Sequence, residues 1–268
     1  MRRPLWVSTL AVIAIVNASP VLGESIEGPS TEIVVVGTVH AATPNYSAKD
    51  LIRILQKVRP DVILFEYPAD MMTPTFEFKS VDEGSLEQQA VLEYVEQADA
   101  EIRPYDIDGR NRYYESTNYF ARERQCYQEM GELLGSQDLS IEARRIIADI
   151  EAAFARRDTL GRSDPATINS YQADTEINEK QWLMYQGIPE IVRVTPELRD
   201  CEDFWNLSRA YWAHRNSEML ANIRRYASEF SGQRLVVLCG FEHRYFLRSH
   251  LYDWNEPPAY IIKEYWEY

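Results

Sequence analysis

The sequence is poor in the residues and short motifs that mark the commonest cofactor and catalytic sites. It contains 3 Cys and 11 Gly among 268 residues, and no two cysteines stand at Cys-x-x-Cys spacing. Gly-x-Gly-x-x-Gly, the P-loop pattern Gly-x-x-x-x-Gly-Lys-[Ser/Thr] and Gly-x-Ser-x-Gly are all missing as well. These absences remove the usual signatures of a redox dithiol, a cysteine zinc site, a dinucleotide site, a P-loop and an α/β-hydrolase nucleophile.

The odd number of cysteines leaves at least one thiol free. Cys239 stands inside the apolar run RLVVLCG, which is typical of a buried strand, so we expect a buried thiol there. Cys126 and Cys201 are then the pair that we expect to form a disulfide, which an exported protein can carry.

Long hydrophobic runs are also lacking, except at the N-terminus. Leu5 to Val16 is apolar, Arg2 and Arg3 precede it, and small or aliphatic residues follow at Val21 to Gly23. This pattern predicts a signal peptide over residues 1–23, followed by a linker over 24–31; the alternative is an uncleaved N-terminal anchor. We therefore predict an exported protein, periplasmic or secreted, with no stable membrane insertion after cleavage.

Basic residues are outnumbered, with 28 Lys and Arg against 42 Asp and Glu. Removing residues 1–23 takes away two Arg and no acid, which moves the formal charge from −14 to −16. A chain this acidic is a poor partner for nucleic acid or an anionic membrane surface. We expect its partner to be a small-molecule or peptide substrate.

The N-terminal part alternates strands and helices. Residues 32–40 and 61–68 read as buried strands, and the amphipathic segment 47–58 between them predicts a helix. This βαβ unit predicts parallel pairing. Residues 85–98 predict a second helix, and 101–108 predict a third strand that Pro104 places at a sheet edge or strand end.

The middle of the chain, residues 113–230, is helical by pattern and forms either a cap over the sheet or one flank of it. Residues 234–243 then predict a buried strand, 244–253 a short helix and 259–268 a terminal strand. The fold class that follows is α/β. It is a single domain over residues 32–268, with a mostly parallel sheet, flanking helices and a large helical insertion between the two βα parts.

Two of the four histidines occupy matching positions. His40 and His243 each end a Gly-x-x-His motif that follows a run of aliphatic residues, in GTVH and GFEH. Glu66 also follows an aliphatic strand, in ILFEYP. The carboxyl ends of parallel strands lie along one sheet edge, where ligand sites form, so we expect these three side chains to meet. The glycine before each histidine permits a sharp turn or a close backbone approach.

Two histidines and one glutamate are the ligand set of a hydrolytic zinc site with an open water position. His40, Glu66 and His243 could therefore hold a divalent metal such as zinc, manganese or cobalt, although the short helical His-Glu-x-x-His motif is absent. Without a metal, His40 could act as general base on water, with Glu66 orienting it or stabilising the imidazolium. Both alternatives stay open at this point.

Other polar residues have simpler interpretations. Arg215 on a predicted helix could bind a substrate carboxylate or an oxyanion, but its spacing alone fits a surface arginine. His214 and His250 read as structural or surface histidines. Asp106 and Asp108 end the third strand, where a role in the turn before Gly109 is the better interpretation.

The ordered set of motifs resembles the superfamily of TraB/GumN and Tiki-like proteins, erythromycin esterases and haem-binding ChaN-like proteins. The matching residues are Gly37, His40, Glu66, Arg215, Asn216, Gly240 and His243. The resemblance implies an α/β fold with both Gly-x-x-His turns facing one cleft lined by His40, Glu66, Arg215 and His243. It also implies metal-dependent peptide cleavage, as in Tiki-like proteins, or ester and lactone hydrolysis without a required metal, as in the esterases. The family's usual segments between Glu66 and the helical region are missing, which indicates a divergent branch whose substrate does not transfer.

The leading hypothesis is an exported hydrolase of peptide, ester or amide bonds, with His40, Glu66, Arg215 and His243 in its active site. The alternative is a ChaN-like protein that binds haem or another small ligand without catalysis. No c-type haem motif or lipid-anchor cysteine supports that alternative. A scaffold without chemistry is the third interpretation.

Overall fold

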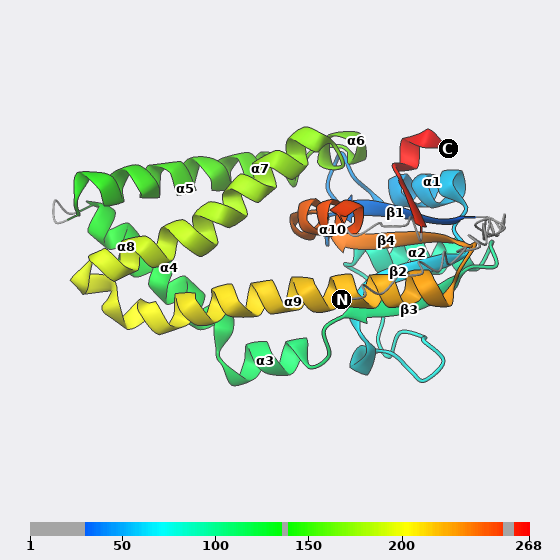
Figure 1. The fold of residues 1–268 in the computed structure, drawn as a ribbon, viewed down its shortest axis with the longest axis horizontal. Coiled ribbons are helices and arrows are strands. Elements are labelled where there is room, and N and C mark those ends of the chain that lie inside the picture. Colours follow the sequence, from blue (N-terminus) through cyan, green and yellow to red (C-terminus); the bar gives the residue numbers. More distant parts are fainter. Residues whose placement is uncertain (1–29, 136–138, 254–259) are drawn as a thin grey trace, which may run out of the picture.

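The computed structural model describes residues 30–135, 139–253 and 260–268. Its centre is a five-stranded parallel sheet in the order β3-β2-β4-β1-β5 (Figure 1). The strands are β1 (Thr31–Thr38), β2 (Val62–Pro68), β3 (Glu101–Asp106), β4 (Arg234–Gly240) and β5 (Tyr260–Lys263). The aliphatic runs of β1, β2 and β4 are buried on both faces, as parallel strands covered by helices require. The predicted α/β class is confirmed.

The strand order corrects one expectation. β1 and β2 are parallel, but they do not pair, because β4 from the far end of the chain lies between them. β3 is an edge strand, as Pro104 predicts. Strand β5 ends at Lys263, and a short 3-10 helix at Tyr265–Glu267 takes the rest of the predicted terminal strand. Ala259 lies outside the described residues.

Helices cover both faces of the sheet. Helices α1 (Ala48–Val58) and α2 (Leu86–Val95) pack on one face, and α9 (Glu202–Glu229) and α10 (Phe241–Asp253) pack on the other. Helix α1 forms where the sequence predicts it, with a capping box at Ser47 and buried leucine and isoleucine on its inner side. Helix α10 starts three residues earlier than predicted, which places His243 in its first turn.

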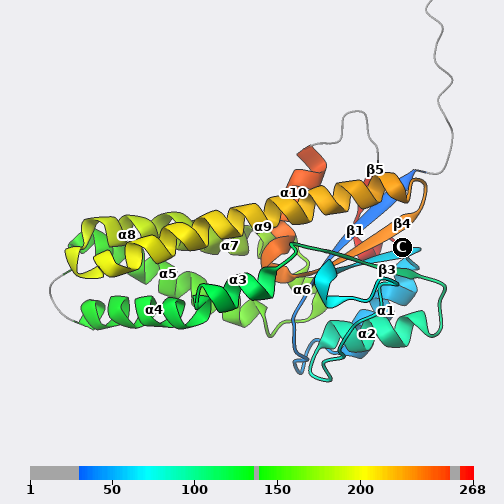
Figure 2. The same ribbon diagram turned by 90° about the horizontal axis from the view of Figure 1, so that it is seen from below.

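The helical region does not cap the sheet but extends beyond its carboxyl edge as a helical arm (Figures 1 and 2). We use this name for α4, α5, α7, α8 and the first half of α9. The four complete helices are α4 (Tyr119–Gly135), α5 (Ile141–Leu160), α7 (Tyr171–Trp182) and α8 (Ile188–Val194). The arm has its own apolar core around Ile188, Phe204 and Trp205. Helix α9 runs from this core to the sheet, where its second half forms one flank.

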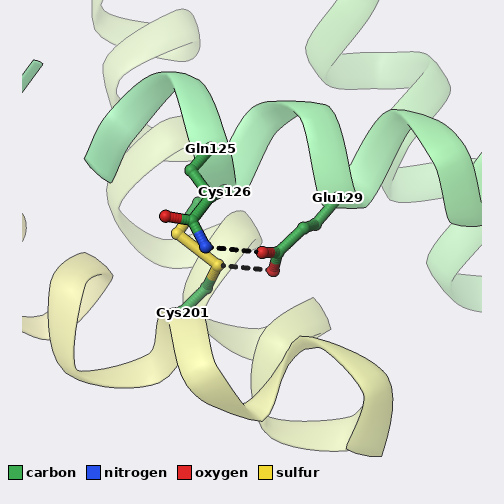
Figure 3. Close-up of a disulfide and its surroundings, with 4 residues drawn as sticks. All are labelled: Gln125, Cys126, Glu129 and Cys201. Carbon is green, nitrogen blue, oxygen red and sulfur yellow. Dashed lines mark hydrogen bonds between the residues drawn. A yellow bond between two sulfur atoms is a disulfide. The ribbon is translucent and has the colours of Figure 1, made fainter. Parts of the chain in front are cut away.

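The predicted disulfide is present. Cys126 of α4 and Cys201, just before α9, are joined across a separation of 75 residues, next to Gln125 and Glu129 (Figure 3). The bond ties two helices of the arm together. Cys239 is the free, buried thiol expected in β4.

The predicted signal peptide and most of the linker lie outside the described residues. Among the helices that the structure describes, none combines the length and the apolar character that a membrane span needs.

Candidate active site

A cleft of about 800 Å³ opens at the carboxyl edge of the sheet. It lies at the ends of β1 and β4, which are paired strands whose following helices, α1 and α10, cover opposite faces of the sheet. Such a divergence opens a crevice in α/β folds. His40, Glu66, Arg215 and His243 all line this cleft. The four predicted site residues therefore share one cavity.

His40 lies at the mouth of the cleft, two residues after β1. Its side chain is 77% exposed, and its Nδ1 lies 3.2 Å from Oε1 of Glu87. The hydroxyl of Thr38 donates to the same carboxylate oxygen at 2.7 Å. The hydrogen bond with Glu87 raises the pKa of His40 to about 9, and the negative charges of Glu66 and Glu87 add to the effect. His40 is therefore a cation at neutral pH.

Gly240, at the end of β4, allows the imidazole of His40 to lie against the backbone. A Cβ at this position would be 3.2 Å from Nε2 of His40 and 3.6 Å from Oε2 of Glu66. The distance to Glu66 is an ordinary contact, but the distance to His40 is shorter than most, so a Cβ here would require the imidazole to shift by a few tenths of an ångström. The close approach expected at Gly240 is thus a contact between the two Gly-x-x-His motifs, because His40 ends the first motif and Gly240 begins the second.

His243 is buried at 4% exposure in the first turn of α10. Its Nδ1 lies 2.6 Å from Oδ1 of Asn216, and the ring stacks on Trp212 with centroids 4.3 Å apart. Because Oδ1 is an acceptor, this contact assigns the proton to Nδ1 and leaves a lone pair on Nε2. Burial lowers the pKa of His243 to about 4, against the opposing charge of Glu66. His243 is therefore neutral at neutral pH.

Glu66 lies between the two histidines. Its Oε1 is 3.7 Å from Nε2 of His243 and accepts from Arg215 at 2.6 Å, while its Oε2 accepts from the Gly240 N–H at 2.6 Å. Burial works against the carboxylate of Glu66. The charges of His243 in its protonated form, of Arg215 and of His40, together with the Gly240 N–H, outweigh burial and lower the pKa of Glu66. At neutral pH, where His243 is neutral, Arg215, His40 and the Gly240 N–H still favour the carboxylate. The carboxylate stays charged.

Arg215 reaches the cleft from α9 and is 7% exposed. Its Nε and Nη2 donate to Asp106 at 2.8 and 2.9 Å, and Nη2 also donates to Glu66. Asp106 accepts from the Ile107 N–H at 2.8 Å, a local contact of the kind expected at a turn, and its carboxylate is also buried against Arg215 and Arg110. This network fixes the guanidinium, which positions Glu66.

The three predicted metal ligands do not fit a divalent cation in this arrangement. Both oxygens of Glu66 already accept strong donors, and one of these donors is the positive charge of Arg215. In the part of the chain that the structure describes, no group of three or more His, Cys, Asp or Glu side chains is placed to hold a metal. The metal stays a prediction from the sequence, and no chemical step below uses one.

Three further residues shape the site: the sequence did not single out Glu87 or Trp212, and it suggested only a turn role for Asp106. Glu87 and Asp106 partner His40 and Arg215, and Trp212 stacks on His243. Trp212 and Arg215 are three residues apart on α9, so they lie on one helix face, which is a signal that the sequence did contain. His214 and His250 are exposed and lie outside the cleft lining.

The resemblance to TraB/GumN and Tiki-like proteins stays a prediction from the motifs. No protein-family model, no curated protein and no solved structure matches the chain.

Proposed function

We propose that the protein is a hydrolase in which water attacks the carbonyl carbon of an ester, amide or peptide bond in this cleft. The single observation that carries the proposal is the opposite tuning of two histidines that line one cavity. The pKa of His243 is lowered to about 4 and that of His40 is raised to about 9. Two titratable groups whose environments separate their pKa values in this way are suited to act as base and acid.

His243 is the general base in this proposal. Nε2 takes a proton from water while the water oxygen bonds to the carbonyl carbon. Asn216 holds the other ring nitrogen and Trp212 holds the ring plane, so the lone pair keeps one direction. The imidazolium that forms lies 3.7 Å from the anionic Glu66, which stabilises it.

His40 is the general acid in this proposal, in place of the general-base and metal-ligand roles that the sequence left open. As the tetrahedral intermediate collapses, the carbon–oxygen or carbon–nitrogen bond breaks and the leaving group takes the proton from Nε2 of His40. Glu87 keeps the cation oriented through Nδ1, as carboxylates do for catalytic histidines. His243 then returns its proton to solvent and His40 regains one, so the cycle closes without an external reagent.

Arg215 and Glu66 are positioning residues rather than reagents in this scheme. Arg215 is committed to Asp106 and Glu66, which is a buried arrangement that fixes geometry. Export to the periplasm or the medium is part of the proposal as well. The Cys126–Cys201 disulfide supports it, because such bonds persist mainly in oxidising compartments.

The test measures hydrolysis of a panel of p-nitrophenyl esters and p-nitroanilides by the parent and by two histidine variants. His243→Gln should lower kcat/KM by about 10²- to 10⁴-fold, as removal of a general base does. The matched control is His250→Gln, which changes an exposed histidine on the same helix outside the cleft. Full activity of His243→Gln with an unchanged circular dichroism spectrum would refute the proposal.

Two further measurements on the purified protein separate the alternatives. Stoichiometric zinc, manganese or cobalt by elemental analysis would support the metal-dependent reading. A Soret band would instead support the haem-binding alternative.

A further inference from the structure

Three arginines line the cleft: Arg110, Arg157 and Arg215. They differ in solvent exposure and in how many of their N–H groups already have hydrogen-bond partners. Arg215 spans two buried carboxylates and is fully engaged. Arg157, which enters the cleft wall from α5, is different: its side chain is 37% exposed. The third, Arg110, pairs with Asp106 and is only 17% exposed. Arg157 is therefore the most exposed arginine of the cleft lining.

The guanidinium of Arg157 is fixed, yet one edge is open. Its Nε donates to Oε1 of Glu242 at 2.6 Å, and its Nη1 donates to Oδ1 of Asp158 at 3.1 Å. The Cζ atom of Arg157 lies 5.4 Å from the ring centroid of Phe241, which is another residue of the cleft wall. Within the described residues, Nη2 has no acceptor. Because the guanidinium is already fixed in place, it loses little conformational entropy when its free Nη2 donates to an incoming carboxylate.

The carboxylates around Arg157 do not supply that missing acceptor. Glu242 is saturated, because its Oε2 also accepts from Lys180 at 2.7 Å and from Gln181 at 2.9 Å. Lys180 is only 4% exposed, so its charge is screened little by solvent. Asp158 is 59% exposed, and solvent weakens its pairing with Arg157. The two carboxylates therefore balance the charges of Arg157 and Lys180, but within the described residues they leave Nη2 of Arg157 without an acceptor.

We propose that Arg157 binds a carboxylate of the substrate in this cleft. The inference rests on the proposed hydrolase function and adds a substrate class to it. Glu242, which holds Arg157, directly precedes His243 in the chain, so the anion site and the proposed base are built on the same turn of α10. Arg157 is then a specificity-determining residue.

The test compares two substrates of nearly equal shape, the p-nitrophenyl monoester of glutaric acid and its 4-carbamoylbutanoate counterpart. The glutaric acid ester carries a carboxylate at the end of its acyl chain, and the 4-carbamoylbutanoate ester carries a neutral carboxamide at the same position. The parent should prefer the anionic ester in kcat/KM by about tenfold or more, as charge-assisted hydrogen bonds of this kind imply. Arg157→Gln should bring the ratio of the two kcat/KM values close to one.

The matched control is Arg156→Gln. Arg156 neighbours Arg157 on α5, is 39% exposed, pairs with Glu179 and does not line the cleft. This variant should keep the parent's preference. A purely structural role for Arg157 would lower both rates together and leave their ratio unchanged, so the ratio separates recognition from stability.

Binding of the free acids separates this inference from the proposed reaction. Glutarate and glutaramate are titrated into the parent and into Arg157→Gln, with calorimetry as the readout. If neither ester is cleaved but glutarate binds about tenfold tighter than glutaramate, only in the parent, the anion site stands and the hydrolase proposal fails. If both esters are cleaved equally well by the parent, or if Arg157→Gln keeps the preference, the anion site is overturned and the hydrolase proposal stands.

Discussion

Replacing Glu87 by Gln tests the division of acid and base roles between the two histidines. The amide of Gln keeps an oxygen that accepts from Nδ1 of His40, but it removes the negative charge 3.2 Å away. Without that charge, the pKa of His40 should fall from about 9 toward its ordinary value of 6.5. His40 is 77% exposed, so solvent screens part of the effect and we expect a drop of about one to two pH units.

The assay is the pH dependence of kcat/KM on any substrate that the parent cleaves. Catalysis needs His243 neutral and His40 protonated, so the parent's profile should be flat between about 4 and 9 and fall outside that window. Glu87→Gln should move only the alkaline limb, and it should move toward lower pH. The acid limb, which belongs to His243, should stay in place.

The stability of the protein should follow the same titration. The raised pKa of His40 stabilises the folded state fully below pH 6.5, and this contribution is lost as the pH rises through about 9. Glu87→Gln should therefore flatten the decline of unfolding free energy across that interval.

Glu93→Gln is the control, because it removes the same charge from an exposed position on α2. The acid role of His40 would be refuted if the alkaline limb of the kcat/KM profile did not move in Glu87→Gln. The same conclusion would follow if that limb moved equally far in Glu93→Gln. Titration of the His40 ring by proton NMR gives the same answer without turnover.

Two further predictions concern the arm and the glycine contact. Replacing Cys126 and Cys201 together by Ser should lower the free energy of unfolding by about 4.5 kcal/mol, since chain entropy assigns that much to a cross-link over 75 residues. Equal urea midpoints for this variant and the parent would contradict the estimate. Gly240→Ala should lower kcat about tenfold, because the added Cβ would lie 3.2 Å from Nε2 of His40 and displace the ring. Unchanged kcat in Gly240→Ala would show that His40 does not depend on this contact.

The sequence was sufficient to predict the sheet-edge part of the site. His40, Glu66 and His243 each follow an aliphatic run, and the carboxyl ends of parallel strands share one edge whatever their order in the sheet. That these three residues line one cleft therefore did not depend on the strand order, which differs from the order expected from the sequence. The insertion of β4 between β1 and β2 is a long-range pairing, and no local pattern encodes it.

The partners of these residues, Glu87 and Asp106, could not be identified from the sequence, because the local sequence around each already explains why an acidic residue stands there. Glu87 stands in the first turn of α2, where an acid favours the helix dipole in any protein. Asp106 stands three residues before Gly109, in a pattern that is typical of a turn. Only the packing of α2 and α9 against the sheet reveals that these carboxylates face a histidine and an arginine.

The position of β4 in the sheet also constrains how the chain folds. Its residues, Arg234–Gly240, pair with β1 on one side and with β2 on the other, so each N-terminal strand lacks its central partner until the last tenth or so of the chain is made. Contacts that join such distant segments slow folding, because the loop must close before any pairing energy is gained. In the nascent chain β2 and β3 can pair early, but β1 stays separate from them until β4 is made. The cleft, whose walls include the ends of both β1 and β4, cannot form in a fragment that lacks either strand.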